Sequence, residues 1–490
     1  MEYLVTAEEM RYYDNYTIEK VGIPAEVLME RAALAALRTI QQLFSEHNVL
    51  SGTVLIMAGV GNNGGDGLAL ARMLSEEGFE VELWNVGNPE RASAQWKLQN
   101  SILGHYRIKR GSIPSRNEYT VMVDALFGTG LSREVCGRYL EAVELFGRIK
   151  GYKLSLDVPS GVDSDTGKIW GSAVRADETV TFGLRKRGLY FYPGCEMAGK
   201  ITIAEIGIAS EAIENRKPGM FQLDGDFKEM LPKRVPWGNK GTFGKVLLVA
   251  GRMNMAGAAI MAGKAAYRIG AGMVKVLTAS QNREILQISV PEALCGSWDD
   301  LQNSLEWADV IAFGPGMGTG EEAKALLMKL LLDSELPLII DADGLNLIAK
   351  EEEIRMLIAE KGKKGRSIVL TPHMGELARL LGVEVTAVQQ DVLNYGRKLT
   401  EELHAVLVAK DARTLIMKED LPVCMNISGN SGMATAGSGD VLCGVIAGLM
   451  AQGMDDFHAA ALGAYYHGKA GEAVAAKIGE YACMAGDLIR

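Results

Sequence analysis

Short apolar runs alternate with helix-patterned segments along most of the chain, and this alternation limits the possible folds more than any other feature. Residues 53–57 form a β-branched run that ends in glycines, and residues 67–77 have the spacing of an amphipathic helix. Further strands are expected at residues 79–86, 120–125 and 153–158. Because short, wholly apolar strands that alternate with helices are typical of parallel sheets covered on both faces, the first half is predicted to be a doubly wound α/β sheet.

A helical pattern precedes this sheet, and a second α/β pattern follows it. Apolar residues recur with helical spacing over residues 7–44, with a break at Val21-Gly22-Ile23-Pro24. Strands are expected again at 245–250, 274–278, 310–313, 336–341, 367–371 and 405–410, with helices at 256–269, 440–452 and 457–475. Between the two patterns, residues 214–240 are polar and contain three prolines. This break near residue 220 predicts two domains, 1–218 and 222–490.

Composition excludes several classes of protein. The 490 residues carry a formal net charge of -10 without a long run of Lys or Arg, so no nucleic-acid partner is expected. The first ten residues contain no basic residue, and no apolar run reaches the roughly 18–20 residues of a membrane helix, so neither a signal peptide nor a membrane partner is expected. The six cysteines lie far apart, which favours thiols in a reducing cytoplasm.

A first glycine cluster lies between an expected strand and an expected helix, where residues 58–67 read AGVGNNGGDG. Three of its glycines match G-x-G-x-x-G, a pattern whose backbone N–H groups favour an anion. Two features argue against an ordinary dinucleotide dehydrogenase: Asn85 stands where a ribose-binding acid is expected, and Asp66 is placed inside the loop. The Asp66 charge would repel a pyrophosphate unless a cation or a ligand hydroxyl offsets it. The alternative is a glycine turn in which Asp66 only caps the helix.

Two more loops are expected at the same edge of the sheet. Residues 123–131 read VDALFGTGL and residues 156–161 read LDVPSG, each at the end of an expected strand. Each acid taken singly is as readily a cap or turn residue. Because ligands of open α/β sheets bind at the carboxyl ends of strands, three acids are predicted to converge on one crevice: Asp66, Asp124 and Asp157. Hard oxygen donors suited to an alkali or alkaline-earth cation are Asn63, Asp124 and Ser160.

The motifs GNNGGDG, DALFGTGL and DVPSG, in this order and spacing, resemble the NAD(P)H-hydrate epimerase domain, and the opening segment with Met10, Asp14 and GIPAEVLMERA fits as well. The resemblance covers about residues 1–215. It implies a Rossmann-like domain that interconverts the two C6 epimers of hydrated nicotinamide nucleotides. Because epimerisation opens and recloses a bond at C6, which carries a hydroxyl and a ring nitrogen, Asp157 is the candidate acid and base.

The same resemblance implies two sets of binding residues. A potassium ion would be held by Asn63, Asp124 and Ser160. Substrate contacts would come from Asn62, Asn63, Gly64, Gly65, Asp66, Gly128, Thr129, Gly130, Leu131, Ser132, Arg133, Glu134 and Asp157.

A second glycine cluster, residues 430–444 (NSGMATAGSGDVLCG), is predicted to open a helix at Gly437-Ser438-Gly439-Asp440. Small residues let the backbone approach a phosphate, and a helix N-terminus stabilises its negative charge. Since a carboxylate cannot bind that phosphate, Asp440 is interpreted as a base that deprotonates a hydroxyl about to attack phosphorus. The alternative is an N-cap Asp after a glycine turn. The motif resembles the anion-hole loop of ribokinase-like phosphotransferases.

A resemblance to the NAD(P)H-hydrate dehydratase domain, over about residues 225–490, is carried by five further motifs: KGTFGKVLLVAG (240–251), MAGAAIMAGKAAYRIGAG (255–272), FGPGMG (313–318), LTPHMGE (370–376) and VAKDARTLI (408–416). It implies a ribokinase-like α/β domain in which Asp440 takes the proton from the C6 hydroxyl. Contacts to the hydrate would come from Ala258, Gly318, His373 and Asp440. Magnesium would assist phosphoryl transfer from ADP, and ADP would be held by Lys410, Asp411, Ala412, Arg413, Thr414 and Gly439.

The leading hypothesis is a bifunctional repair enzyme that epimerises hydrated NAD(P)H and dehydrates its S form with ADP, giving AMP and phosphate. Two alternatives stay open at this point. One is a kinase of a small hydroxylated metabolite with a regulatory first domain, since the GSGD loop permits both chemistries. The other is a nucleotide-binding scaffold without activity. No residue chooses ADP over ATP, but the fused arrangement resembles the bacterial enzymes, which use ADP. Homo-oligomers are expected because this fold often assembles.

Overall fold

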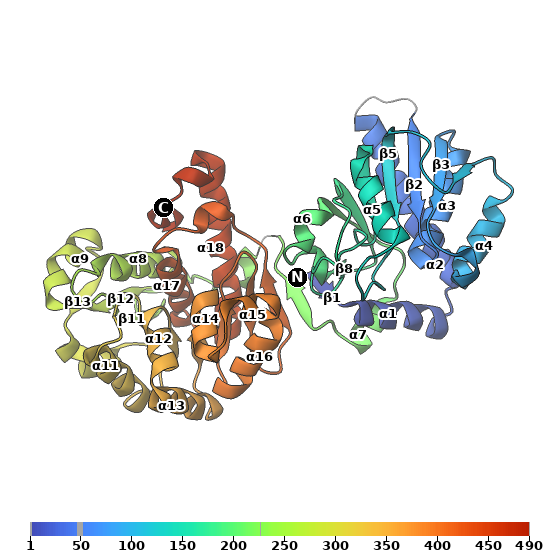
Figure 1. Ribbon diagram of the computed structural model, residues 1–490. Coiled ribbons are helices and arrows are strands. Elements are labelled where there is room, and N and C mark those ends of the chain that lie inside the picture. The colour runs from blue at the N-terminus through green and yellow to red at the C-terminus, as the bar shows by residue number, and fades with distance from the viewer. Residues whose placement is uncertain (1, 47–51, 226, 490) are drawn as a thin grey trace. The chain divides into compact units, whose positions relative to one another are not determined.

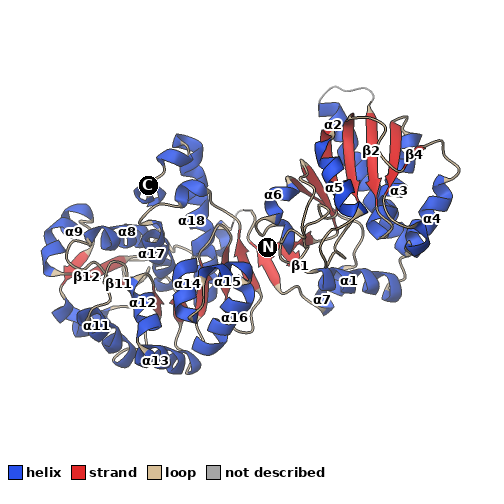
Figure 2. Cartoon of the chain, in the orientation of Figure 1, coloured by secondary structure: helices blue, strands red, loops and turns tan. Residues whose placement is uncertain are grey.

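The computed structural model describes residues 2–46, 52–225 and 227–489, and the chain divides into two compact units, Glu2–Gly219 and Met220–Arg490 (Figure 1). The division lies inside the polar segment that separates the two sequence patterns. Each unit contains parallel strands flanked by helices (Figure 2), which confirms the predicted α/β class. No helix among the described residues has both the length and the hydropathy needed to cross a membrane.

The main sheet of the N-terminal unit has the strand order β4-β3-β2-β5-β6-β7-β9, and its neighbouring strands are parallel. The order reverses between β2 and β5, which is where open α/β sheets bind ligands. A short parallel pair joins β1 to β8. The strands are β1 (Glu2–Val5), β2 (Thr53–Ala58), β3 (Glu80–Asn85), β4 (Lys109–Gly111), β5 (Glu118–Ala125), β6 (Lys150–Leu156), β7 (Glu178–Phe182), β8 (Arg185–Lys186) and β9 (Lys200–Ala204). The helices are α1 (Ala7–Asn15), α2 (Ala25–Glu46), α3 (Asn62–Glu76), α4 (Ala94–Leu103), α5 (Arg138–Arg148), α6 (Gly194–Ala198) and α7 (Ser210–Asn215).

Both faces of this sheet are buried. On the central strand β2, Val54 and Ile56 face a core that includes residues of α2 and α3, whereas Leu55 and Met57 face a second core with Phe146 of α5. Because successive side chains of a strand point to opposite faces, both sets must be apolar in a sheet covered on both sides. The run at residues 53–57, apolar after Thr53, therefore predicts the doubly wound sheet correctly.

Helix α3 begins at Asn62, whereas the sequence pattern placed its start at residue 67. The sequence pattern predicts a loop over these glycines, because glycine disfavours helix interiors. Here they allow close packing: a Cβ atom on Gly64 would lie 2.0 Å from the carbonyl oxygen of Gly59. Asp66 consequently lies in the second turn of α3, so both its predicted loop position and its alternative role as a helix cap are wrong.

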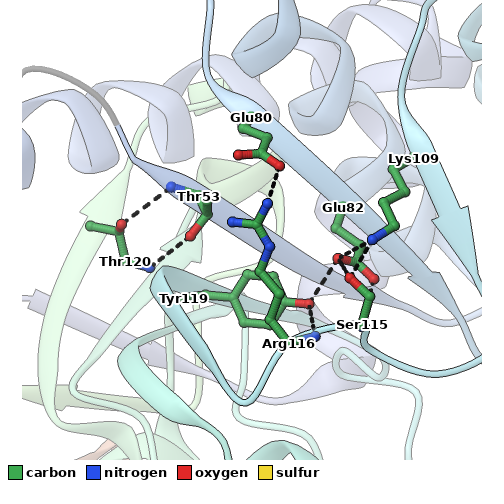
Figure 3. A network of polar contacts seen from close by, with 8 residues as sticks. All are labelled: Thr53, Glu80, Glu82, Lys109, Ser115, Arg116, Tyr119 and Thr120. Atoms are coloured by element: carbon green, nitrogen blue, oxygen red, sulfur yellow. Dashed lines mark hydrogen bonds and ion pairs between the residues drawn. The ribbon is translucent and has the colours of Figure 1, made fainter.

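A polar network fixes the amino ends of the strands, at the edge opposite the glycine cluster (Figure 3). Glu82 of β3 is buried, and its carboxylate accepts hydrogen bonds from Ser115 N (2.8 Å), Ser115 Oγ (2.5 Å) and Tyr119 Oη (2.8 Å). Lys109 Nζ lies 3.5 Å from the same carboxylate. These contacts lower the pKa of Glu82 although its burial opposes the shift. The network joins β3, β4 and β5 through side chains.

In the sheet of the C-terminal unit, the strands lie in the order β13-β12-β11-β14-β15-β16-β17-β18-β19-β10. Strands β17, β18 and β19 pair antiparallel, and β10 pairs parallel with β19. Its strands are β10 (Met220–Gln222), β11 (Lys245–Val249), β12 (Met273–Leu277), β13 (Leu294–Gly296), β14 (Val310–Phe313), β15 (Leu338–Ile340), β16 (Ile368–Leu370), β17 (Val406–Ala409), β18 (Thr414–Met417) and β19 (Val423–Asn426). Its helices are α8 (Ala256–Arg268), α9 (Arg283–Ser289), α10 (Leu301–Trp307), α11 (Glu321–Leu332), α12 (Asp343–Lys350), α13 (Glu352–Lys363), α14 (Met374–Leu381), α15 (Val385–Gln390), α16 (Val392–Leu403), α17 (Ser438–Ala451) and α18 (Asp456–Ile478).

Helix α17 is the buried centre of this unit. It packs so closely on α8 that a Cβ atom on Gly444 would lie 2.1 Å from the carbonyl oxygen of Ala262. Almost all of its residues after Asp440 are buried. The packing explains why this stretch of sequence is apolar on all sides and holds the first turn of α17 in a fixed position.

Candidate functional site

The N-terminal unit contains a cavity of about 820 Å³ at the carboxyl ends of β2, β5 and β6. It lies at the predicted crevice. Of the residues expected to contact the substrate, those that line it are Asn62, Asn63, Asp66, Gly128, Thr129, Gly130, Leu131, Ser132, Arg133 and Asp157. Gly64, Gly65 and Glu134 are not among its lining residues. The glycines instead allow close packing, since a Cβ atom on Gly65 would lie 2.7 Å from Cε of Met29.

Asp124, the second of the three acids, is fully buried at the end of β5. Its carboxylate accepts hydrogen bonds from Ser155 Oγ (3.0 Å), Ser160 N (2.8 Å) and Ser160 Oγ (2.6 Å). Burial raises the pKa of Asp124, and these hydrogen bonds oppose that shift. Asp124 does not line the cavity, so it differs from Asp66 and Asp157, which do.

Asn63 lies beside this cluster. Its amide nitrogen donates to the carbonyl oxygens of Phe127 (2.7 Å) and Leu156 (3.2 Å), and Phe127 N donates to Ser160 Oγ (2.9 Å). Its own oxygen, Oδ1, is buried and has no hydrogen-bond partner among the described residues. Such an oxygen is costly unless a ligand or ion meets it. The structure therefore brings Asn63 and Ser160 together through Phe127, with Asp124 behind Ser160.

Asp157 follows β6 directly and has a left-handed backbone, with φ of 67°. Its Oδ1 is held by Lys186 Nζ at 2.6 Å and by Thr181 Oγ1 at 3.3 Å. Its Oδ2 lies 3.5 Å from the position that a Cβ atom of Gly128 would occupy, and it accepts no hydrogen bond from the described residues. One oxygen of Asp157 is thus anchored, and the other points to the glycine loop that lines the cavity.

Two further acids stand near Asp157 in the cavity wall. Burial raises the pKa of Asp14, on α1, to about 6, with Lys186 opposing the shift. Burial, and after it the charges of Asp157 and Asp14, raises the pKa of Asp66 well above its usual range. Neither Asp14 nor Lys186 was assigned a catalytic or binding role from the sequence: Asp14 is named only as part of the opening segment that fits the epimerase resemblance, and no motif surrounds Lys186.

In the C-terminal unit, α17 begins at Ser438 after Gly437, whose φ of 91° requires glycine. At Gly439 the backbone lies close to two charged side chains. A Cβ atom there would lie 3.0 Å from Lys410 Nζ and 3.7 Å from Asp341 Oδ2, so glycine leaves room for this pair. Asp440 is the third residue of the helix, so it is not the N-cap that the alternative interpretation required.

Charges around Asp440 tune its carboxyl group. Burial, followed by the nearby carboxylate of Asp341, raises the pKa of Asp440 to about 7, while Lys410 opposes the shift. Asp341 itself accepts a hydrogen bond from Lys410 Nζ at 2.9 Å. Asp341 follows β15 directly, as Asp157 follows β6 in the other unit, and its position in LIIDADGL carries the same signal. A carboxyl group that titrates near neutral pH suits a general base.

Of the residues expected to contact the hydrate, Ala258 lies in the first turn of α8, Gly318 in the loop after β14, and His373 at the start of α14. Gly318 donates its N–H to Asp343 Oδ2 (2.7 Å), and the same loop lies on α8, where a Cβ atom on Gly316 would be 3.2 Å from Ala258 Cβ. His373 caps α14: its Nδ1 accepts from Gly375 N (3.0 Å), which leaves Nε2 3.5 Å from Glu376 Oε1. Burial and the charge of Lys410 lower the pKa of His373, so the ring is neutral at physiological pH.

The expected nucleotide-binding residues divide into two groups. Lys410 pairs in register with His373 and turns its side chain toward Asp341 and Gly439. Residues 411–413 form the turn between β17 and β18, and Thr414, the first residue of β18, donates from Oγ1 to the carbonyl oxygen of Asp411 (3.2 Å). The structure therefore brings Lys410 close to Gly439 and into the surroundings of Asp440.

His467 of α18 is a residue that the sequence did not single out. Its Nε2 lies 3.3 Å from Ser438 Oγ in the first turn of α17. Burial lowers the pKa of His467 to about 4, so the ring is neutral and its hydrogen bond fixes the Ser438 side chain.

Two family models match the chain. Residues 25–188 match the model described as YjeF-related protein N-terminus, and residues 246–490 match NAD(P)H-hydrate dehydratase. The bifunctional NAD(P)H-hydrate repair enzyme of Moorella thermoacetica is 38% identical over 99% of this chain and 95% of its own length. The enzyme of the same name from Escherichia coli is 32% identical over 98% of this chain and 92% of its own length.

Solved structures resemble the second half of the chain. A ribokinase-like superfamily protein from Enterococcus faecalis has 30% identity and a TM-score of 0.49, covering 55% of this chain and 93% of that one. An ADP/ATP-dependent NAD(P)H-hydrate dehydratase from Bacillus subtilis, co-crystallised with ATP and Mg²⁺, has 30% identity and a TM-score of 0.47, covering 53% and 91%. From the family models and the full-length relatives, the chain belongs to the bifunctional NAD(P)H-hydrate repair enzymes, with an epimerase and a dehydratase in one chain as both motif resemblances predict.

Proposed function

We propose that the two activities use separate sites, epimerisation in the cavity of domain 1–218 and dehydration around Asp440 in domain 222–490. The observation that carries this proposal is a matching arrangement in the two units. In each, an acid stands beside a glycine-rich turn and a buried or partly buried lysine, Asp157 with Lys186 and Asp440 with Lys410. Such a group combines a proton acceptor with a surface for phosphates.

In the epimerase site, Asp157 takes the proton of the C6 hydroxyl as the bond from C6 to the ring nitrogen opens, and returns it when the ring recloses. Its Oδ2 is the reacting oxygen, since Oδ1 is held by Lys186. The hydrated nucleotide is bound by the lining residues named above and by Gly64, Gly65 and Glu134 next to them. Because Lys186 holds the Asp157 carboxylate in place, its Oδ2 can stay next to C6 of a bound substrate while the ring opens and recloses.

Potassium is the proposed cation of this domain, held by Asn63, Asp124 and Ser160. The unpartnered Oδ1 of Asn63 and the hydroxyl and carboxylate oxygens of the other two fit a hard monovalent cation. When bound, the cation would offset the buried charge of Asp124 and favour an anionic substrate.

In the dehydratase site, Asp440 takes the proton of the C6 hydroxyl, and that oxygen attacks the terminal phosphoryl group of ADP, which releases AMP. The phosphate then leaves C6 as C5 loses a proton, which restores the double bond of NAD(P)H. Lys410 and Gly439 face the phosphates, and Asp411, Ala412, Arg413 and Thr414 bind the rest of the nucleotide. Ala258, Gly318 and His373 bind the hydrate. Magnesium accompanies ADP because the transferred oxygens need their charge offset.

We also propose that the protein is cytoplasmic and forms a homo-oligomer. The wide spacing of the six cysteines supports a reducing cytoplasm. The homo-oligomer is proposed because this fold often assembles. The molecular mass of the full chain, measured by analytical sedimentation, tests this proposal.

The decisive experiment gives the full chain both epimers of hydrated NADPH with ADP, ATP or neither, and follows each epimer by NMR. Epimer exchange is expected without nucleotide, and NADPH only with nucleotide and magnesium. Asp157→Asn should stop exchange alone, and Asp440→Asn should stop dehydration alone. Dehydration by Asp440→Asn at nearly the wild-type rate would disprove the assignment of the base, and a stable phosphoester would favour the kinase alternative.

A further inference from the structure

Four ionisable side chains from four separate elements line the cavity of the N-terminal unit: Asp14 of α1, Asp66 of α3, Asp157 after β6 and Lys186 of β8. Lys186 is only 1% exposed, and its ammonium group is bonded to Asp157 Oδ1 and to the carbonyl oxygen of Phe182. Asp14 and Asp66 differ from this pair. Among the described residues, their pKa values are shifted by burial and by nearby charged side chains, with no hydrogen bond involved. Their carboxyl groups therefore face the cavity without a hydrogen-bonded protein partner.

The charges of this group do not balance when all three acids are ionised. One lysine offsets one carboxylate, so two negative charges would remain in a wall that must receive the phosphates of a dinucleotide. Arg11 and Arg133 also line the cavity, yet Lys186 is the cation that lowers the pKa of both Asp14 and Asp66. This excess of negative charge favours one protonated acid at neutral pH. Asp66 is the one expected to carry the proton, because burial and the charges of Asp157 and Asp14 raise its pKa.

We propose that Asp66 is a second catalytic residue of the epimerase, an acid that acts opposite the base Asp157, and that Asp14 is a positioning residue that keeps the proton on Asp66. The proposal rests on the assignment of the cavity as the epimerase site. It also answers the conflict that the sequence raises, since a protonated Asp66 does not repel a pyrophosphate bound at the same turn.

The proposed step moves two protons and breaks one bond. Asp157 takes the proton of the C6 hydroxyl, and the oxygen forms a double bond to C6. The electron pair of the bond between C6 and the ring nitrogen goes to the nitrogen, which takes the proton of Asp66. Rotation about the C5–C6 bond turns the other face of the aldehyde to the nitrogen. When the bond re-forms, the nitrogen returns its proton to Asp66, and the C6 oxygen takes one from Asp157. The two carboxyl groups end as they began.

The test measures epimer exchange by the full chain across pH, with the uncatalysed rate subtracted, for Asp66→Asn and Asp14→Asn. Asp66→Asn should lower kcat by about 10²–10⁴ with a small change in KM, because a proton donor to the leaving nitrogen is lost. Asp14→Asn should stay active. It removes a negative charge that raises the pKa of Asp66, so activity at high pH should fall off at a lower pH than in the wild type.

Two controls separate the possible causes of failure. Thermal unfolding of each variant checks that the fold is intact, and the pH profile of Asp14→Asn comes from an active enzyme, so it decides the proposal even if Asp66→Asn unfolds. Wild-type exchange by Asp66→Asn, or an unmoved alkaline limb in Asp14→Asn, overturns the proposal. If Asp157→Asn also exchanges epimers normally, the cavity is not the epimerase site, and the proposed function fails with it.

Discussion

Asp440 is a carboxyl group that its surroundings hold close to half-ionisation at neutral pH. Burial and the carboxylate of Asp341 raise its pKa to about 7. Dehydration needs the ionised form of a base, so kcat should be constant above this pKa and fall about tenfold per pH unit below it. The rate of ADP-dependent NADPH recovery, measured at constant ionic strength from about pH 5.5 to about pH 8.5, checks the prediction.

The same profile needs a matched control, and the exposed Asp333 at the end of α11 provides one. Asp333→Asn should leave both the rate and the profile unchanged. Asp440→Asn should lower kcat by about 10²–10⁴ at every pH, since an amide cannot accept the proton. A wild-type profile without a change of slope near pH 7 would contradict the role of Asp440.

Single residues were predictable from the sequence where a motif marks them. Asp66 and Asp440 stand next to glycines, Asp157 lies at an expected strand end four residues before Gly161, and the structure places each in or beside a candidate site. Lys186 was not predictable, because the pairing of β7 with β6 brings its two-residue strand to Asp157, and no local pattern encodes that contact. Asp14 belongs to the opening segment that fits the epimerase resemblance, but its place on an amphipathic helix does not indicate a catalytic role.

At the scale of elements, burial decides which strands the sequence reveals. Strands β2, β5 and β6 lie within one or a few residues of their expected positions. The apolar residues of β2 and β5 are buried on both faces of the sheet, and Leu154 and Leu156 of β6 are buried on one face. Strand β7, with the sequence ETVTF, is not predicted from the sequence. It is buried as well, but its polar residues alternate with apolar ones, so it has no continuous apolar run. The ends of helices were less predictable than their existence, as α3 shows.

The network at the amino end of β3 gives a test at this scale. Glu82→Gln removes the charge that accepts hydrogen bonds from Ser115 and Tyr119, and it should lower the free energy of unfolding by about 1–3 kcal/mol. Glu80, on the same strand, pairs with Arg116 in an exposed position (Figure 3). Glu80→Gln is therefore the matched control and should change stability by less than about 1 kcal/mol. Urea unfolding of both variants measures the difference.

The pH dependence of this effect has a definite sign. The pKa of Glu82 is lowered in the folded chain, so its contribution is present above the unfolded pKa of a glutamate and is lost as the pH falls toward the folded value. The gap between wild type and Glu82→Gln should narrow on acidification. Epimer exchange should be unaffected, because the network lies at the opposite ends of the strands from the cavity. An equal effect of Glu80→Gln would contradict this account.

For the whole molecule, the sequence shows two α/β patterns and a polar break between them, and the family models fall on either side of that break. What the sequence does not show is a strand inside the break. β10 (Met220–Gln222) is hidden between Pro218 and a polar stretch, yet its three side chains are buried and it pairs with β19. A short strand whose partner lies about 200 residues away has no local signature, because its burial depends on that partner.

This strand makes the independence of the two proposed domains testable. Fragment 220–490 keeps β10 and should dehydrate the hydrate with ADP as the full chain does, whereas fragment 223–490 loses the buried side chains of Met220 and Phe221 and exposes the edge of β19. Burial of two large apolar side chains is worth about 3–6 kcal/mol, so the shorter fragment should unfold at a markedly lower urea concentration. Fragment 1–219 should retain epimer exchange without nucleotide. Equal stability of the two C-terminal fragments would show that β10 adds nothing to the second domain, and loss of exchange in fragment 1–219 would show that the epimerase needs the rest of the chain.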